Sequence, residues 1–174
     1  MIYRSISCIL AILTMSGCSK PLLVVNKETP AATVEFRNLS TGYLQQFVFD
    51  DPVTCSGAKL ISHIVQPNET QTHQIPAAKI ITIRTNAWNL PAPPGYIAWC
   101  QSTAFSTRLE PGQSYRIEFM ADAEKKLCGA FLTTTTGSPA NAVRRTVSGT
   151  EIGGGGVLAG SLPCSATDDL SRLK

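Results

Sequence analysis

Apolar and polar residues alternate with a period of two along most of the chain, and this pattern limits the fold more than any other feature. Tyr115, Ile117 and Phe119 fall on one side of one such stretch. Their neighbours Arg116 and Glu118 fall on the other side. Successive side chains of a strand point to opposite faces of a sheet, so the pattern predicts a half-buried β-strand. Similar stretches predict strands at 33–38, 43–50, 59–66, 79–88, 96–105, 115–121 and 127–136.

Turn-forming residues separate these stretches. Asp-Asp-Pro at 50–52, Gln-Pro-Asn at 66–68 and Glu-Pro-Gly at 110–112 are examples. Proline presets one turn dihedral, and glycine readily adopts the positive one. No convincing amphipathic helix lies between the predicted strands. We therefore predict an all-β protein with a single antiparallel β-sandwich of seven or eight strands, of the immunoglobulin-like or transthyretin-like type.

The domain limits follow from changes in composition. The strand signals predict a β-sandwich domain over residues 33–147. The final residues, 148–174, contain four consecutive glycines at 153–156. Glycine loses more conformational entropy on ordering than any other residue. We therefore predict a flexible Gly-rich tail, held to the domain only if Cys164 is bridged.

Four of the six cysteines lie within or after the predicted domain. Cys55, Cys100, Cys128 and Cys164 favour two disulfides in an exported chain, and four cysteines allow three pairings. Zinc binding is the alternative, but the sequence has no CxxC motif and no Cys-His pair at ligand spacing. Cys100 and Cys128 flank one predicted hairpin, which favours their pairing. Cys55 with Cys164 then follows by elimination.

The first residues have the organisation of an export signal. Arg4 precedes an uncharged run at residues 6–15. Ten residues are too few for a membrane span, which needs about 20. A basic residue, a short apolar run and then small residues are typical of a secretory signal peptide. We therefore predict that residues 1–17 are a signal peptide.

The sequence Met-Ser-Gly-Cys at 15–18 resembles the lipobox of bacterial lipoproteins. The resemblance implies that Cys18 is lipidated before cleavage, and that residues 18–32 are the lipidated cysteine and a tether. Ser19 after the cysteine implies an outer-membrane protein that faces the periplasm. A plain secreted protein, in which Cys18 falls there by chance, is the alternative.

Residues 33–136 look like small proteobacterial envelope lipoproteins of β-sandwich type. The similarity is carried by "FVFDDPVTCSG", an Ile-rich strand and "LEPGQSYRIEF". Transthyretin-like lipoproteins of type VI secretion are similar in size, anchor and architecture. That second likeness is general, because no motif places this chain among them.

Several chemistries find no support in the sequence. The formal net charge is +3, without the basic stripe that a nucleic-acid-binding protein carries. The glycine run lacks the lysine of a phosphate-binding loop, and the residues around Ser148 lack a nucleophile elbow. His63 and His73 have no third ligand with motif support. We predict no catalytic residues, no metal site and no cofactor.

Aromatic residues around a stiff loop are the candidate binding residues. Trp88 and Tyr96 flank the sequence Asn-Leu-Pro-Ala-Pro-Pro-Gly at 89–95. Aromatic anchors are common in recognition surfaces. Trp99 is favoured as a core residue beside Cys100. We predict a non-catalytic binding or scaffolding role with an envelope protein as partner; a small-ligand or glycan binder and an accessory lipoprotein of a secretion system are the alternatives.

Overall fold

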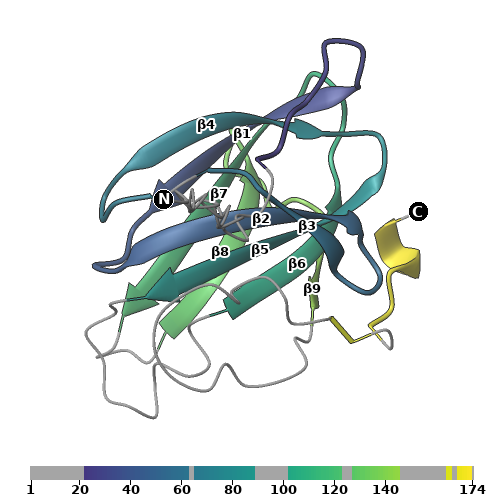
Figure 1. Cartoon of the computed structure of the whole chain (residues 1–174). Coiled ribbons are helices and arrows are strands. Elements are labelled where there is room, and N and C mark those ends of the chain that lie inside the picture. The colour runs from purple at the N-terminus through teal and green to yellow at the C-terminus, as the bar shows by residue number, and fades with distance from the viewer. Residues whose placement is uncertain are drawn as a thin grey trace, which may run out of the picture.

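The computed structural model describes residues 22–62, 65–88, 102–122, 127–145, 164–165 and 168–173. Within these ranges the protein consists of β-strands in two sheets (Figure 1). The described elements are β1 (Ala31–Asn38), β2 (Tyr43–Asp51), β3 (Ser56–Leu60), β4 (Thr70–Pro76), β5 (Ile80–Trp88), β6 (Ser102–Arg108), β7 (Ser114–Asp122), β8 (Leu127–Thr134), β9 (Ala142–Arg145) and the 3-10 helix η1 (Ser171–Leu173). The prediction of an all-β protein is confirmed.

The strand order separates the chain into a four-stranded and a five-stranded sheet. The orders are β4-β1-β7-β8 and β3-β2-β5-β6-β9. β1 and β7 pair in parallel, so the prediction of a wholly antiparallel arrangement is wrong at this pair. Parallel neighbours need a long crossover connection, and here the chain passes through the other sheet between them. Alternation along one strand carries no information about the direction of its neighbour.

The two sheets share one apolar core. Val34 and Phe36 of β1 and Ile83 of β5 are completely buried and belong to the same cluster. That cluster draws on both sheets, which therefore pack face to face. Its buried members are Ala32, Val34, Phe36, Val48, Ile61, Ile75, Ala77, Ile81, Ile83, Phe105, Leu109, Tyr115, Ile117 and Leu132. The predicted alternation of β7 is confirmed, because Tyr115, Ile117 and Phe119 are its buried residues in the core.

β5, at the centre of the five-stranded sheet, is buried on both of its faces. Every residue of β5 from Ile81 to Ala87 is buried. On the face away from the other sheet, Phe47 and Phe49 pack in a separate cluster with Cys55 and Cys164. On this same face β5 carries Thr82, Arg84 and Asn86, which are polar although they are buried. The turn after β2 and the carboxyl-terminal segment form this outer layer.

One predicted strand ends earlier in the structure than expected, and two strands of the structure were not predicted. The strand predicted at 59–66 ends at Leu60, where the backbone N–H of Ile61 turns to the carbonyl of Gln46. β4 was not predicted, because four of its residues are Thr or Gln and it lacks apolar alternation. β9 was not predicted either; it is a short edge strand in which Arg145 is buried.

Residues outside the range 33–147 contact the sheets at both ends of the described chain. β1 begins at Ala31, and Leu22 already forms a parallel bridge with Leu60. At the other end, Leu173 is only 2% exposed. The carboxylate of Asp169 accepts a hydrogen bond from the backbone N–H of Ser171 and caps η1. Residues 164–165 and 168–173, which are the described part of the range 148–174, therefore contact the sheets.

The half-buried side chain of His73 lies on the core side of β4. Its ring meets the ring of Phe36 edge-on, with 6.0 Å between ring centroids, and its Nε2 lies 3.3 Å from Oε1 of Gln71. Burial lowers the pKa of His73 from its ordinary value, because it disfavours the charged form. The unfolded chain therefore binds a proton at a pH where the folded chain does not.

We predict that the free energy of unfolding falls as the pH drops below about 6.5, and that His73→Gln reduces this fall. Below that pH the unfolded state takes up the proton first, and the loss ends at the lower pKa of the folded protein. The measurement is urea unfolding at about pH 5 and about pH 7.5 in a His63→Gln background. His73 is then the only histidine. An identical pH dependence with and without His73→Gln would contradict the prediction.

Candidate functional site

A disulfide holds the carboxyl-terminal segment on the outer face of the five-stranded sheet. Cys55 and Cys164 are bonded across a separation of 109 residues, and this is the pairing that followed by elimination. Both side chains are buried beside Phe47 and Phe49. The backbone N–H of Cys164 also donates to the carbonyl of Thr54 at 3.0 Å.

The turn that carries Cys55 has a specific backbone requirement. Cys55 lies in the left-handed region with a φ of 57°, and so does Gly57 with a φ of 68°. A methyl group on Gly57 would lie 2.9 Å from Cβ of Asp50, so this position needs glycine. Asp51 accepts hydrogen bonds from the side chain of Thr54 and the backbone N–H of Val53. These two bonds, that of Thr54 first, lower the pKa of Asp51.

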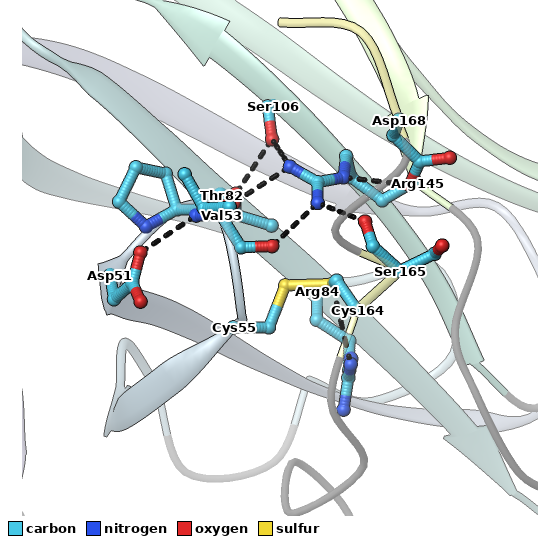
Figure 2. A network of polar contacts seen from close by, with 11 residues as sticks. Asp51, Val53, Cys55, Thr82, Arg84, Ser106, Arg145, Cys164, Ser165 and Asp168 are labelled. Atoms are coloured by element: carbon cyan, nitrogen blue, oxygen red, sulfur yellow. Dashed lines mark hydrogen bonds and ion pairs between the residues drawn. A yellow bond between two sulfur atoms is a disulfide. The ribbon is translucent and has the colours of Figure 1, made fainter.

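Arg145 is buried and makes five hydrogen bonds, one for each of its N–H donors. Its Nε donates to Oδ2 of Asp168 at 2.9 Å, and one terminal nitrogen donates to the carbonyl of Pro52 at 2.7 Å and to Oγ of Ser106 at 3.2 Å. The other terminal nitrogen donates to the carbonyls of Val53, at 2.7 Å, and Ser165, at 2.8 Å. Figure 2 shows the guanidinium between the turn after β2 and the carboxyl-terminal segment. One side chain therefore links β9, β6, that turn and the end of the chain.

A second buried arginine lies on the other side of the disulfide. Arg84 of β5 is fully buried, with its guanidinium carbon 5.0 Å from the centre of the Phe49 ring. Its terminal nitrogen lies 3.8 Å from the sulfur of Cys164 (Figure 2). Register explains the placement, because Arg84 pairs with Ala104, which in turn pairs with Arg145. Both arginines therefore face the same side of the sheet.

The outward face of the four-stranded sheet has a different character. Here Glu35 pairs with Arg116 at 2.7 Å and Arg37 pairs with Glu118 at 2.8 Å. Both pairs join β1 to β7 across their parallel register. Their side chains are about one-third exposed, so each pair contributes about 0–1 kcal/mol to stability. Their main effect is to fill this part of the face with charges that are already paired.

Beside these ion pairs lies an apolar patch formed by Leu39, Met120 and Phe131. Their exposed fractions are 40%, 39% and 54%. Met120 lies opposite Gly129, and a methyl group on Gly129 would be 3.5 Å from Cζ of Phe131. The Phe131 ring therefore lies beside Gly129, at a distance where a methyl group would make ordinary van der Waals contact with it. These three residues are called the β7–β8 patch below.

Buried polar contacts hold Leu39 in this position. The backbone N–H of Leu39 donates to the carbonyl of Phe119. The preceding Asn38 is fully buried, and its amide donates to the carbonyls of Gly42, Val65 and Gln66. The turn after β1 is therefore fixed, and Leu39 continues the outward face of β1.

Most of the residues predicted as sites lie outside the described residues or have undescribed side chains. Cys18, Tyr96 and Cys100 belong to the first group. Cys128 lies in β8 and Trp88 ends β5 opposite Tyr43, but only their backbones are described. The Cys100–Cys128 pairing and the binding role of Trp88 and Tyr96 therefore stay predictions.

The β7–β8 patch was missed by the sequence reading, although a signal was present. Phe131 stands at a strand position whose two neighbours in the alternation are Gly129 and Thr133. Such a strand face should be polar, so a phenylalanine there is an exception to the pattern. The sequence gave no indication that Arg145 is buried, because it does not show which of the adjacent Arg144 and Arg145 points toward the disulfide.

The described residues contain no group of three or more His, Cys, Asp or Glu side chains that could share a metal ion. His63 lies outside these residues, and His73 packs on Phe36. In the described part of the chain, no helix has the length and apolar character that a membrane span requires. No model of a known protein family matches the chain, and no curated protein matches it significantly.

We predict that Asp168→Asn lowers the free energy of unfolding by about 3 kcal/mol or more, because it leaves the buried guanidinium of Arg145 without its counter-charge. The matched control is Asp50→Asn, which removes a similar carboxylate from an exposed pair with Lys59. The control should cost about 1 kcal/mol or less. Urea unfolding of both variants under oxidising conditions measures the difference. Equal losses would show that Arg145 does not depend on Asp168.

Proposed function

We propose that this protein is a bacterial envelope lipoprotein, anchored through acyl chains on Cys18, whose β-sheet body binds another protein without catalysing a reaction. The observation that carries the binding role is the β7–β8 patch. Phe131 is more than half exposed on a strand face that would otherwise be polar. Apolar patches rimmed by polar residues are typical of interaction sites.

The composition of this face favours a protein as the partner. Phenylalanine, methionine and arginine are enriched in protein interfaces, where an apolar centre is surrounded by a polar rim. Here Met120 and Phe131 form the centre, and the Arg37–Glu118 pair lies beside them. A sugar needs donors and acceptors for its hydroxyl groups, but these charged side chains already bond to each other. The glycan-binding alternative therefore has less support.

The strand order supports a transthyretin-like type for the two sheets. β1 lies between β4 and β7, parallel to β7, and not beside β2. In the immunoglobulin-like type the first strand lies beside the second, so this order favours the transthyretin-like alternative. β9 is added at one edge. This order favours a second candidate function, that of an accessory lipoprotein of a secretion system, since transthyretin-like lipoproteins of type VI secretion have this architecture. Fold similarity alone does not establish a function.

The proposed cellular location follows from the amino-terminal residues. Cys18 follows the short apolar run and two small residues, and Ser19 comes next. Two or more acyl chains give a stable anchor, because each buried methylene adds about 0.8 kcal/mol. We place the protein in the outer membrane, facing the periplasm. There the β7–β8 patch would meet other envelope proteins.

The anchor predicts that cells fed an alkyne analogue of palmitate label the wild-type chain and not Cys18→Ser. The cysteine thiol is the acceptor of the diacylglyceryl group, and a serine hydroxyl is a much weaker nucleophile. In-gel fluorescence after click reaction measures the label, and Cys8→Ser is the matched control that should keep it. Equal labelling of wild type and Cys18→Ser would remove the proposed anchor.

Binding through the patch predicts that benzoylphenylalanine at position 131 forms a protein adduct in cells, whereas the same residue at Thr72 does not. Thr72 is exposed on the same sheet, on β4. Mass spectrometry identifies the adduct, and the purified partner is then titrated against wild type and Met120→Asp. A charge in the centre of the interface should weaken binding by about tenfold or more. Unchanged affinity would exclude the patch as the interface.

A further inference from the structure

The first described residues lie along an edge of the five-stranded sheet. Leu22 forms a parallel bridge with Leu60, and the backbone N–H of Leu23 donates to the carbonyl of Leu60 at 2.7 Å. The side chain of Leu23 packs against the main core. These contacts attach the chain to the end of β3, eight residues before β1 begins.

The side chains of this segment alternate between two environments. Leu23 and Val25 are half-buried, whereas Leu22 and Val24 are 50% and 76% exposed. Attachment to Leu60 fixes which residues face outward. The apolar side chains of Leu22 and Val24 are therefore both exposed to solvent on the same side of the segment. Between them, Leu23 packs against the main core. Val24 has the largest exposed fraction among the large hydrophobic residues of the described chain.

The distance from the proposed anchor decides what these side chains meet. Leu22 lies four residues after Cys18, and four extended residues reach at most about 14 Å. The headgroup region of a bilayer is about 5–7 Å deep on each side of the hydrocarbon core. An acylated Cys18 at that boundary keeps Leu22 and Val24 within reach of the interfacial layer.

We propose that Leu22 and Val24 insert into the interfacial layer of the membrane that holds Cys18, and so form a second, non-covalent membrane contact. This inference rests on the proposed lipid anchor. The bridge to Leu60 transmits the contact to the domain, so the β3 edge faces the bilayer. The contact and the β7–β8 patch belong to different sheets and use different residues. Membrane contact and partner binding therefore do not compete for the same side chains.

The test places benzoylphenylalanine at position 24 or at Thr72 in the full-length protein, in cells grown with radioactive phosphate. Acyl chains on Cys18 carry no phosphorus, so radioactivity on the irradiated protein marks a cross-linked phospholipid. We expect at least about fivefold more label at position 24 than at position 72. Equal label, or a protein adduct in place of a lipid adduct at position 24, would overturn the inference.

Palmitate labelling of the same samples separates this inference from the proposed function. An acylated protein without a phospholipid adduct at position 24 refutes the second contact and leaves the anchor intact. A chain without acylation refutes both. The two failures are therefore distinguishable in one experiment.

A second pair of variants tests the role of the bridge to Leu60. Leu23→Pro removes the N–H donor, whereas Leu23→Ala keeps the donor and shortens the side chain. We expect the ratio of label at positions 24 and 72 to fall at least about threefold in Leu23→Pro, because the domain then turns on a longer tether. In Leu23→Ala this ratio should fall less than in Leu23→Pro, because the backbone hydrogen bond to Leu60 is kept. An unchanged ratio in Leu23→Pro would show that the bridge does not orient the domain.

Discussion

The five hydrogen bonds of Arg145 are the interaction on which the outer layer of the structure depends. The guanidinium is buried, so its charge is tolerable only with a counter-charge and a partner for every donor. Asp168 supplies the counter-charge, and carbonyls of the turn after β2 and of the carboxyl-terminal segment supply most of the partners. These partners are brought together only when both segments are folded. The disulfide of Cys55 and Cys164 then keeps Phe47 and Phe49 covered.

The sequence predicts the parts of the fold whose burial is one-sided. β7 is the clearest case, since its apolar residues face the core and Arg116 and Glu118 face outward. β4 escaped prediction because half-burial of Gln71 and His73 at an edge leaves no apolar signature. The direction of β1 relative to β7 depends on the path of the chain through the other sheet. The alternation of residues within one strand gives no information about that path.

The candidate sites were harder to predict for a related reason. The register of the strands decides whether an arginine is exposed to solvent or buried with hydrogen-bond partners. Arg144 is exposed and Arg145 is buried, because the two adjacent side chains point to opposite faces of the sheet. The β7–β8 patch joins Met120 of β7 and Phe131 of β8 to Leu39, the residue that follows β1. Each residue alone is unremarkable in sequence, because single exposed apolar residues are common. Only the pairing of the strands turns them into one surface.

The proposed anchor and the folded domain together restrict which partners this protein can meet. With Cys18 as the proposed anchor, residues 18–21 can span at most about 14 Å between the membrane and the segment joined to Leu60. Under the proposed anchor, the domain would stay within a thin layer beside the bilayer. The β7–β8 patch lies on paired strands, with Leu39 held through the buried amide of Asn38. Little ordering is then needed on binding, and confinement to the membrane raises the effective concentration of a partner anchored in the same surface. A membrane-proximal protein fits both properties better than a diffusing periplasmic one.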